Sequence, residues 1–180
     1  MASVLESLLG VFGFGQPKDL DVEDPVTGLT PRQKNLVRST WALVMPNIRT
    51  VSVELIITFF DKHPGYYSLF KSFEGLSIAD LKTSKKFTAH ATTVFHVLAS
   101  VVDALEDTEL LVELCTKLGK AHAGRNVPPS AFEDLKPIVM QVLSEKLGKK
   151  LTPSTAEAWD KTLTVAFSLI KKELAAPASE

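Results

Sequence analysis

The stretch Leu118-Gly119-Lys120-Ala121-His122-Ala123-Gly124 decides how the rest of the chain is interpreted. It closes a run in which Leu111, Leu114 and Leu118 recur at helical spacing. His122 lies four residues beyond Leu118 and therefore continues the same apolar stripe. Gly124 follows lysines in the last turns, which is typical of a helix C-terminus. A buried imidazole is costly unless a partner satisfies its nitrogen atoms, so His122 is the first candidate for a functional residue.

The bulk composition is that of one ordinary globular domain. The chain has 180 residues, of which 45% are hydrophobic and 23% charged, and this length can bury a core large enough to enclose a cofactor. A formal net charge of −1 provides no broad basic field, so we expect no nucleic-acid partner. Cys115 is the only cysteine, which excludes an internal disulfide and favours a reducing compartment. No apolar stretch is expected to approach the roughly 20 residues of a membrane span.

Residues 1–29 form an N-terminal extension whose pattern differs from the rest. Apolar side chains within residues 3–12 share one helical face, which predicts a short amphipathic helix. A flexible acidic linker follows. The segment lacks the features of a secretory signal, and Ala2 excludes the N-myristoylation pattern. Two interpretations remain open: a helix that docks on its own domain or frays, and a membrane-surface or self-association element.

Helical patterns account for residues 30–174, and residues 175–180 are predicted to be a flexible tail. Thr30, Pro31 and Gln33 form a capping box that begins the first ordered helix, which continues to Pro46. Further helices are predicted for residues 47–62, 85–105, 108–123, 130–147 and 153–172, with one helical turn in the polar linker 74–84. Pro137 should kink its helix or mark a turn. No sustained strand pattern occurs, so the predicted class is all-α.

A second inward histidine lies in the helix predicted for residues 85–105. His90 shares a face with Phe87, Val94 and Val101, whereas His96 points elsewhere. An aromatic-dense stretch, residues 66–73, precedes this helix and is too rich in large rings for an ordinary solvent loop.

Together these features resemble an animal globin, particularly the intracellular neuroglobin- and cytoglobin-like branch. The matching positions follow the family's order: Trp41, Pro64, Phe70 with Phe73, His90 with Val94, Leu118-Gly119 before His122, and Trp159. The resemblance implies a globin fold, a three-over-three helical sandwich that encloses haem b (iron protoporphyrin IX). A globin domain at residues 30–174 would then carry the N-terminal extension.

The resemblance also implies the site. His122 would be the proximal iron ligand, and His90 the distal histidine and a candidate sixth ligand. The cofactor-binding residues would be Phe70, Phe73, His90, Val94, Leu118, His122, Val127 and Phe132. Ile56, His90 and Val94 would line the gas pocket. Thr93 stands where many relatives carry a basic residue that reaches a haem propionate, which leaves Lys86 and Arg125 as candidates for that contact.

The leading function is reversible binding of O2, CO and NO by a cytoplasmic haem globin, for storage, transport or sensing. One alternative is enzymatic, a nitric-oxide dioxygenase or peroxidase activity that needs an external reductase. Others are a redox or gas sensor that acts through the N-terminal extension, and a globin-shaped interaction module without haem. Five- and six-coordinate resting haem both remain open, and the neuroglobin-like spacing of the two histidines favours the six-coordinate form. A monomer and a homodimer also remain open.

Overall fold

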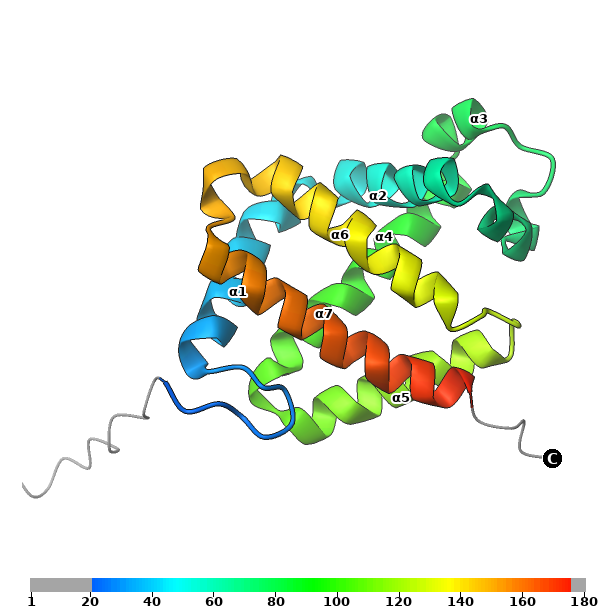
Figure 1. Cartoon of the computed structure of the whole chain (residues 1–180). Helices are drawn as coiled ribbons and strands as arrows, with labels where there is room; N and C mark the ends of the chain where they lie inside the picture. Colours follow the sequence, from blue (N-terminus) through cyan, green and yellow to red (C-terminus); the bar gives the residue numbers. More distant parts are fainter. Residues whose placement is uncertain (1–20, 176–180) are drawn as a thin grey trace, which may run out of the picture.

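The structure is a computed structural model that describes residues 21–175 (Figure 1). The amphipathic helix predicted for residues 3–12 and the tail at 176–180 lie outside the described residues. Within the described range all regular elements are α- or 3₁₀-helices, which confirms the all-α class. The α-helices are α1 (Pro31–Val44), α2 (Ile48–Lys62), α3 (Ile78–Thr83), α4 (Lys85–Asp103), α5 (Thr108–Ala123), α6 (Ser130–Leu147) and α7 (Pro153–Leu174). The 3₁₀-helices are η1 (Met45–Asn47), η2 (Pro64–Leu69), η3 (Lys71–Phe73), η4 (Ala104–Glu106) and η5 (Gly148–Lys150).

Local sequence signals set where several helices begin. Thr30 accepts a hydrogen bond from the Gln33 backbone N–H, and the Gln33 side chain accepts one from the Thr30 N–H, so the predicted capping box is confirmed. The Ser84 side chain caps α4 by accepting a hydrogen bond from the Phe87 backbone N–H. Each cap satisfies backbone donors that have no partner inside the helix.

The helices form two layers. In one layer α2, α6 and α7 pack side by side, and in the other α1, α4 and α5 are neighbours. The layers meet where α2 lies against α4 and where α7 lies against α1 and α5 (Figure 1). Large side chains from both layers fill the interior, including Trp159 and Phe87, which are fully buried. This is the predicted three-over-three sandwich.

The face of α4 that is most deeply buried is not the one that contains His90. Phe87, Ala91, Phe95 and Val102 are almost completely inaccessible, whereas His90, Val94, Val97 and Leu98 are half-buried. The apolar stripe predicted from the sequence therefore mixes two faces. One face packs into the core, and the adjacent one borders the space between the layers.

In α5, too, the most deeply buried face is not the one that contains the histidine. Leu111, Cys115 and Gly119 are buried, and the predicted stripe residues Leu114, Leu118 and His122 are half-buried. A Cβ atom on Gly119 would lie 2.6 Å from the Cβ of Glu173 and 2.7 Å from the carbonyl oxygen of Ile170. Gly119 thus allows the close approach of α5 and α7.

Pro137 does not end its helix, because α6 continues from Ser130 to Leu147.

The expectation that no apolar stretch approaches the length of a membrane span needs correction. Two helical segments, Pro31–Lys62 and Lys85–Glu106, are long and apolar enough to span a membrane by length and composition alone. They are weak evidence for a span, because core helices pass the same test. The first is interrupted at η1, and both contribute side chains to the core.

The described part of the acidic N-terminal segment is docked on the helices. Leu29 and Thr27 are buried, with exposed fractions of 0% and 2%. The Lys161 ammonium of α7 donates to the Gly28 carbonyl at 3.1 Å and to the Glu23 carboxylate at 2.8 Å. Residues 21–29 therefore pass along the surface next to α1 and α7 (Figure 1).

Candidate functional site

His122 lies in the last turn of α5 and is held there by its own helix. Its Nδ1 donates a hydrogen bond to the Leu118 carbonyl oxygen one turn earlier, at 2.9 Å. Because a carbonyl can only accept, the proton of the neutral ring lies on Nδ1 and the lone pair on Nε2. In metal-ligating histidines, the ring nitrogen that does not bind the metal commonly donates a hydrogen bond of this kind, which orients the ring. The geometry therefore presents His122 as a ligand through Nε2.

Phenylalanine rings pack next to the His122 imidazole. The Phe132 ring, from the start of α6, meets the His122 ring edge to face with centroids 5.4 Å apart. Phe167 of α7 contacts Phe132 in the same manner, also at 5.4 Å. The Val127 N–H donates to the His122 carbonyl at 3.3 Å, which ties the connection after α5 to the histidine backbone. Phe167 was not among the predicted site residues, since the sequence marks it only as part of an apolar stripe.

His90 lies on α4 against the aromatic corner. Its ring is 5.4 Å from the ring of Phe70 and 5.6 Å from that of Phe73, both in edge-on arrangements. Phe60 of α2 in turn holds Phe70, with centroids 4.8 Å apart. Sequence reasoning missed this supporting role of Phe60, although Phe59-Phe60 was already an apolar pair in α2. Within the described residues neither ring nitrogen of His90 has a hydrogen-bond partner.

Burial and neighbouring charges lower the pKa of both imidazoles. Burial lowers the pKa of His90, and the nearby His122 and Arg125 lower it further. Burial likewise lowers the pKa of His122, opposed by its hydrogen bond to Leu118 and aided by Arg125. Both rings are therefore neutral at physiological pH. Neutral imidazole is the form that ligates a metal.

The remaining predicted residues lie on the elements that frame this pair. Val94 and Leu118 are half-buried, one turn after His90 and one turn before His122 respectively. Ile56 is 4% exposed, on the buried face of α2, the helix that packs against α4. Val127 is half-buried after α5, and Phe132 is 7% exposed.

The candidate basic residues for a propionate contact are exposed. The Lys86 ammonium donates to the Ser72 carbonyl at 3.2 Å. The Arg125 guanidinium donates to the Ala121 carbonyl within its own chain segment. Thr93 donates to Ala89 within α4 and is also exposed. Arg125 is the one whose charge reaches both imidazoles.

Two surface clefts lie elsewhere. The larger, about 670 Å³, runs between α2, α3 and the start of α4 and is lined mainly by exposed and half-buried residues, among them Arg49 and Lys85. The smaller, about 450 Å³, lies at the aromatic corner and includes Phe70. We locate the site by its side-chain chemistry, because neither cleft contains His90 or His122.

The residues present fit an iron porphyrin. The site offers a neutral imidazole with a free Nε2 at the end of α5 and a second neutral imidazole on α4, each in contact with phenylalanine rings. Nitrogen ligands of intermediate softness suit iron, and a flat apolar group would be in contact with apolar walls. No group of three or more potential ligands among His, Cys, Asp and Glu occurs in the described residues, so a bare metal ion has no comparable site there.

Comparisons with known proteins agree with the helical fold described above. The family model described as Globin matches residues 53–170. The chain is 30% identical over 141 residues to a globin of Tritia mutabilis, covering 77% of this chain and 96% of the relative. It is 28% identical over 141 residues to cytoglobin-2 of Danio rerio, covering 77% of this chain and 79% of the relative.

Solved structures show the same fold. The crystal structure of a hexacoordinated heme protein from an anhydrobiotic tardigrade matches with a TM-score of 0.79 at 19% identity, covering 86% of this chain and 100% of that chain. These findings confirm the resemblance to a cytoglobin-like animal globin and the predicted fold.

Proposed function

The chain belongs to the globin family, and we propose that, as a haem-binding globin, it holds haem b between His90 and His122 and binds O2 and other diatomic gases reversibly. The observation that carries this proposal is the orientation of His122. Its Nδ1 is engaged by the Leu118 carbonyl, which would leave Nε2 free to hold the haem iron, with His90 as the second candidate ligand. When bound, haem supplies an iron centre whose open coordination position takes a diatomic ligand.

The chain's own residues have separate tasks at this site. The Leu118 carbonyl fixes the tautomer of His122 and raises the basicity of the ring. His90 can donate its N–H to a polar diatomic ligand, because its ring nitrogens have no partner in the described residues. Phe70, Val94 and Phe132 pack into or against the apolar core and would keep water away from a bound haem, which would slow its proton-dependent oxidation.

We further propose that His90 is the sixth ligand in the resting state. The absence of a hydrogen-bond partner for its ring nitrogens in the described residues, and its position among the aromatic rings of Phe70 and Phe73, support this assignment. A gas would then compete with His90, and its observed affinity would be the intrinsic affinity multiplied by the fraction of molecules in which His90 is not bound.

Replacing His122 tests the proposal. His122→Ala should abolish the Soret band of the purified, haemin-reconstituted protein, because it removes the axial nitrogen. His96→Ala is a matched control, since His96 is exposed on α4 and should leave the spectrum unchanged. A Soret band of normal intensity and position in His122→Ala would contradict the assignment.

Replacing His90 separates the two coordination states. His90→Leu should convert the ferrous spectrum from six- to five-coordinate and should increase the rate of CO binding at least tenfold, because competition by the side chain is lost. If the rate and spectrum of His90→Leu equal those of the unaltered protein, His90 is not the resting ligand.

The setting proposed for this activity is the cytoplasm. The single cysteine is fully buried, and burial raises its pKa to about 11, so it is a poor candidate for oxidative pairing. The similarity to cytoglobins supports the same interpretation. Storage, transport and sensing differ in oxygen affinity and rate, which stopped-flow measurements on the full chain would distinguish.

A further inference from the structure

The N-terminal segment is built around one carboxylate. The Asp24 Oδ1 accepts hydrogen bonds from the backbone N–H groups of Val26 and Thr27, both at 2.9 Å. The Asp24 backbone closes the same loop, because its N–H donates to the Leu29 carbonyl at 3.0 Å and its carbonyl accepts from the Gly28 N–H at 2.8 Å. We call residues 24–29 the N-terminal strap. Its conformation is fixed by its own hydrogen bonds.

The strap is tied to α1 by a buried lysine. The Lys34 ammonium donates to Asp24 Oδ2 at 2.9 Å, and Lys34 is only 4% exposed. Burial tends to raise the pKa of Asp24, but hydrogen bonds from the Thr27 N–H, Lys34 and the Val26 N–H lower it to about 2. A lysine this deeply buried requires a compensating anion, so removing Asp24 leaves an expensive unpaired charge.

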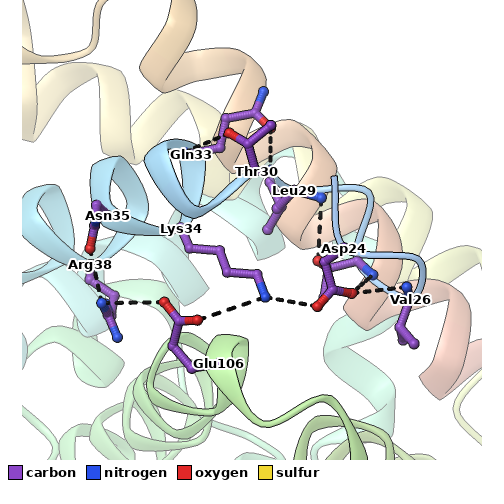
Figure 2. A network of polar contacts seen from close by, with 10 residues as sticks. Asp24, Val26, Leu29, Thr30, Gln33, Lys34, Asn35, Arg38 and Glu106 are labelled. Carbon is purple, nitrogen blue, oxygen red and sulfur yellow. Dashed lines mark hydrogen bonds and ion pairs between the residues drawn. The ribbon is translucent and has the colours of Figure 1, made fainter. Parts of the chain in front are cut away.

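Lys34 also faces a second carboxylate, at the junction between the two histidine-bearing helices. Its ammonium lies 4.0 Å from Glu106 Oε2, and Arg38 Nη2 lies 3.4 Å from Glu106 Oε1. Glu106 is the last residue of η4, which joins α4 to α5. Figure 2 shows Lys34 between Asp24 on one side and Glu106 on the other.

This junction is the vertex from which α4 and α5 extend. His90 precedes η4 by about four turns of α4, and His122 follows it by about four turns of α5. At 1.5 Å per residue each histidine is about 20 Å from the vertex, so a rotation of about 3° there moves a histidine by about 1 Å. A shift of that size matters for axial ligation, in which bond lengths are fixed to a few tenths of an ångström.

We propose that the N-terminal strap braces the η4 junction through Lys34, so that the state of the N-terminal extension controls the separation of His90 and His122. The control of haem coordination rests on the function proposed above; the bracing itself does not. A partner or surface that pulls residues 21–23 away from the helices would strain the Asp24–Lys34 contact and loosen the junction. Binding at the extension would thereby alter the positions of His90 and His122 without direct contact with either residue.

Hydrogen exchange on the full chain tests the bracing. Asp24→Asn retains a carbonyl oxygen for the Val26 and Thr27 N–H groups but removes the charge that pairs with Lys34. It should increase amide exchange at least threefold in residues 24–29 and also in residues 104–111. Asp61→Asn, an exposed aspartate of α2 far along the chain from the strap, is the control and should change neither region. Faster exchange in the strap alone, or in neither region, overturns the proposal.

A double variant tests the route through Lys34 and covers the case in which Asp24→Asn folds poorly. Glu106→Gln alters a half-exposed side chain and should increase exchange in residues 104–111 by itself. If the strap acts through Lys34 and Glu106, Asp24→Asn should add little to junction exchange in the Glu106→Gln background. Additive effects on the junction overturn the proposed route.

The effect of the strap on the histidine pair is measured separately, through the rate of CO binding. Asp24→Asn should change the CO-binding rate of the ferrous, haem-reconstituted protein at least twofold, whereas Asp61→Asn should not. If Asp24→Asn increases exchange in residues 104–111 but leaves the CO-binding rate unchanged, the proposed coupling between the strap and the histidine pair is overturned. Absence of a Soret band in the unaltered chain would instead refute the proposed function, while the exchange results would still decide the bracing.

Discussion

Gly119 sets the distance between two helices at the scale of a single residue. The atoms that would meet its Cβ are the Cβ of Glu173 and the backbone carbonyl oxygen of Ile170. Neither can move without moving α7 itself. Because Gly119 lies one turn before the end of the helix that carries His122, this contact also helps to position the imidazole.

Gly119→Ala should therefore destabilise the protein by about 1–3 kcal/mol, although alanine is intrinsically the better helix former. Urea unfolding followed by circular dichroism measures the change. Gly124→Ala is the matched control: the nearest atom to its Cβ would be 3.8 Å away, an ordinary contact. Equal stability of Gly119→Ala and the unaltered protein would show that α7 adjusts freely.

At the scale of elements, α4 and α5 each have two apolar faces with different tasks. The buried face of α5, with Cys115 and Gly119, packs into the core and against α7. The neighbouring face, with Leu118 and His122, is half-buried and frames the site. Helical periodicity detects apolar residues in both faces, but it cannot tell a face covered by another helix from one that borders a ligand site.

Helix caps are also element-scale features, and the capping box of α1 is a clear case. Thr30→Ala removes the acceptor of the Gln33 N–H and should cost about 1 kcal/mol in the free energy of unfolding. Thermal or urea unfolding provides the measurement. Ser144→Ala, at an exposed site in the last turns of α6, should change stability by less than about 0.5 kcal/mol. A larger loss at Ser144 than at Thr30 would contradict this account of the cap.

At the scale of the whole molecule, the strap makes stability depend on acid pH. The pKa of Asp24 is about 2 in the folded chain, below its ordinary value of 3.8. As the pH falls below 3.8, the unfolded chain therefore takes up a proton that the folded chain does not. Asp24 contributes about 2 kcal/mol at neutral pH, and this contribution is lost as the pH falls from about 4 to 2.

A comparison with Asp24→Asn isolates that contribution. The difference in unfolding free energy between the unaltered chain and Asp24→Asn should be constant above pH 5 and should shrink towards pH 2. Urea titrations at several pH values provide the measurement. A difference that stays the same down to pH 2 would mean that the charge of Asp24 contributes nothing to stability.

The sequence by itself determined the helices, their order and the histidine pair. Apolar periodicity and caps such as Thr30–Gln33 act within a few residues along the chain, so they can be read without knowing the fold. The ordered positions from Trp41 to Trp159 then indicated the family, which the comparisons confirmed.

Only the tertiary structure decided which faces meet. It placed Phe60 behind Phe70, Phe167 behind Phe132, and the Lys34 ammonium between Asp24 and Glu106. It also showed that Pro137 is accommodated inside α6 and that the strap is docked on the helices. These contacts join residues distant in the chain, and their free energies depend on burial and on distances that exist only after the layers have packed.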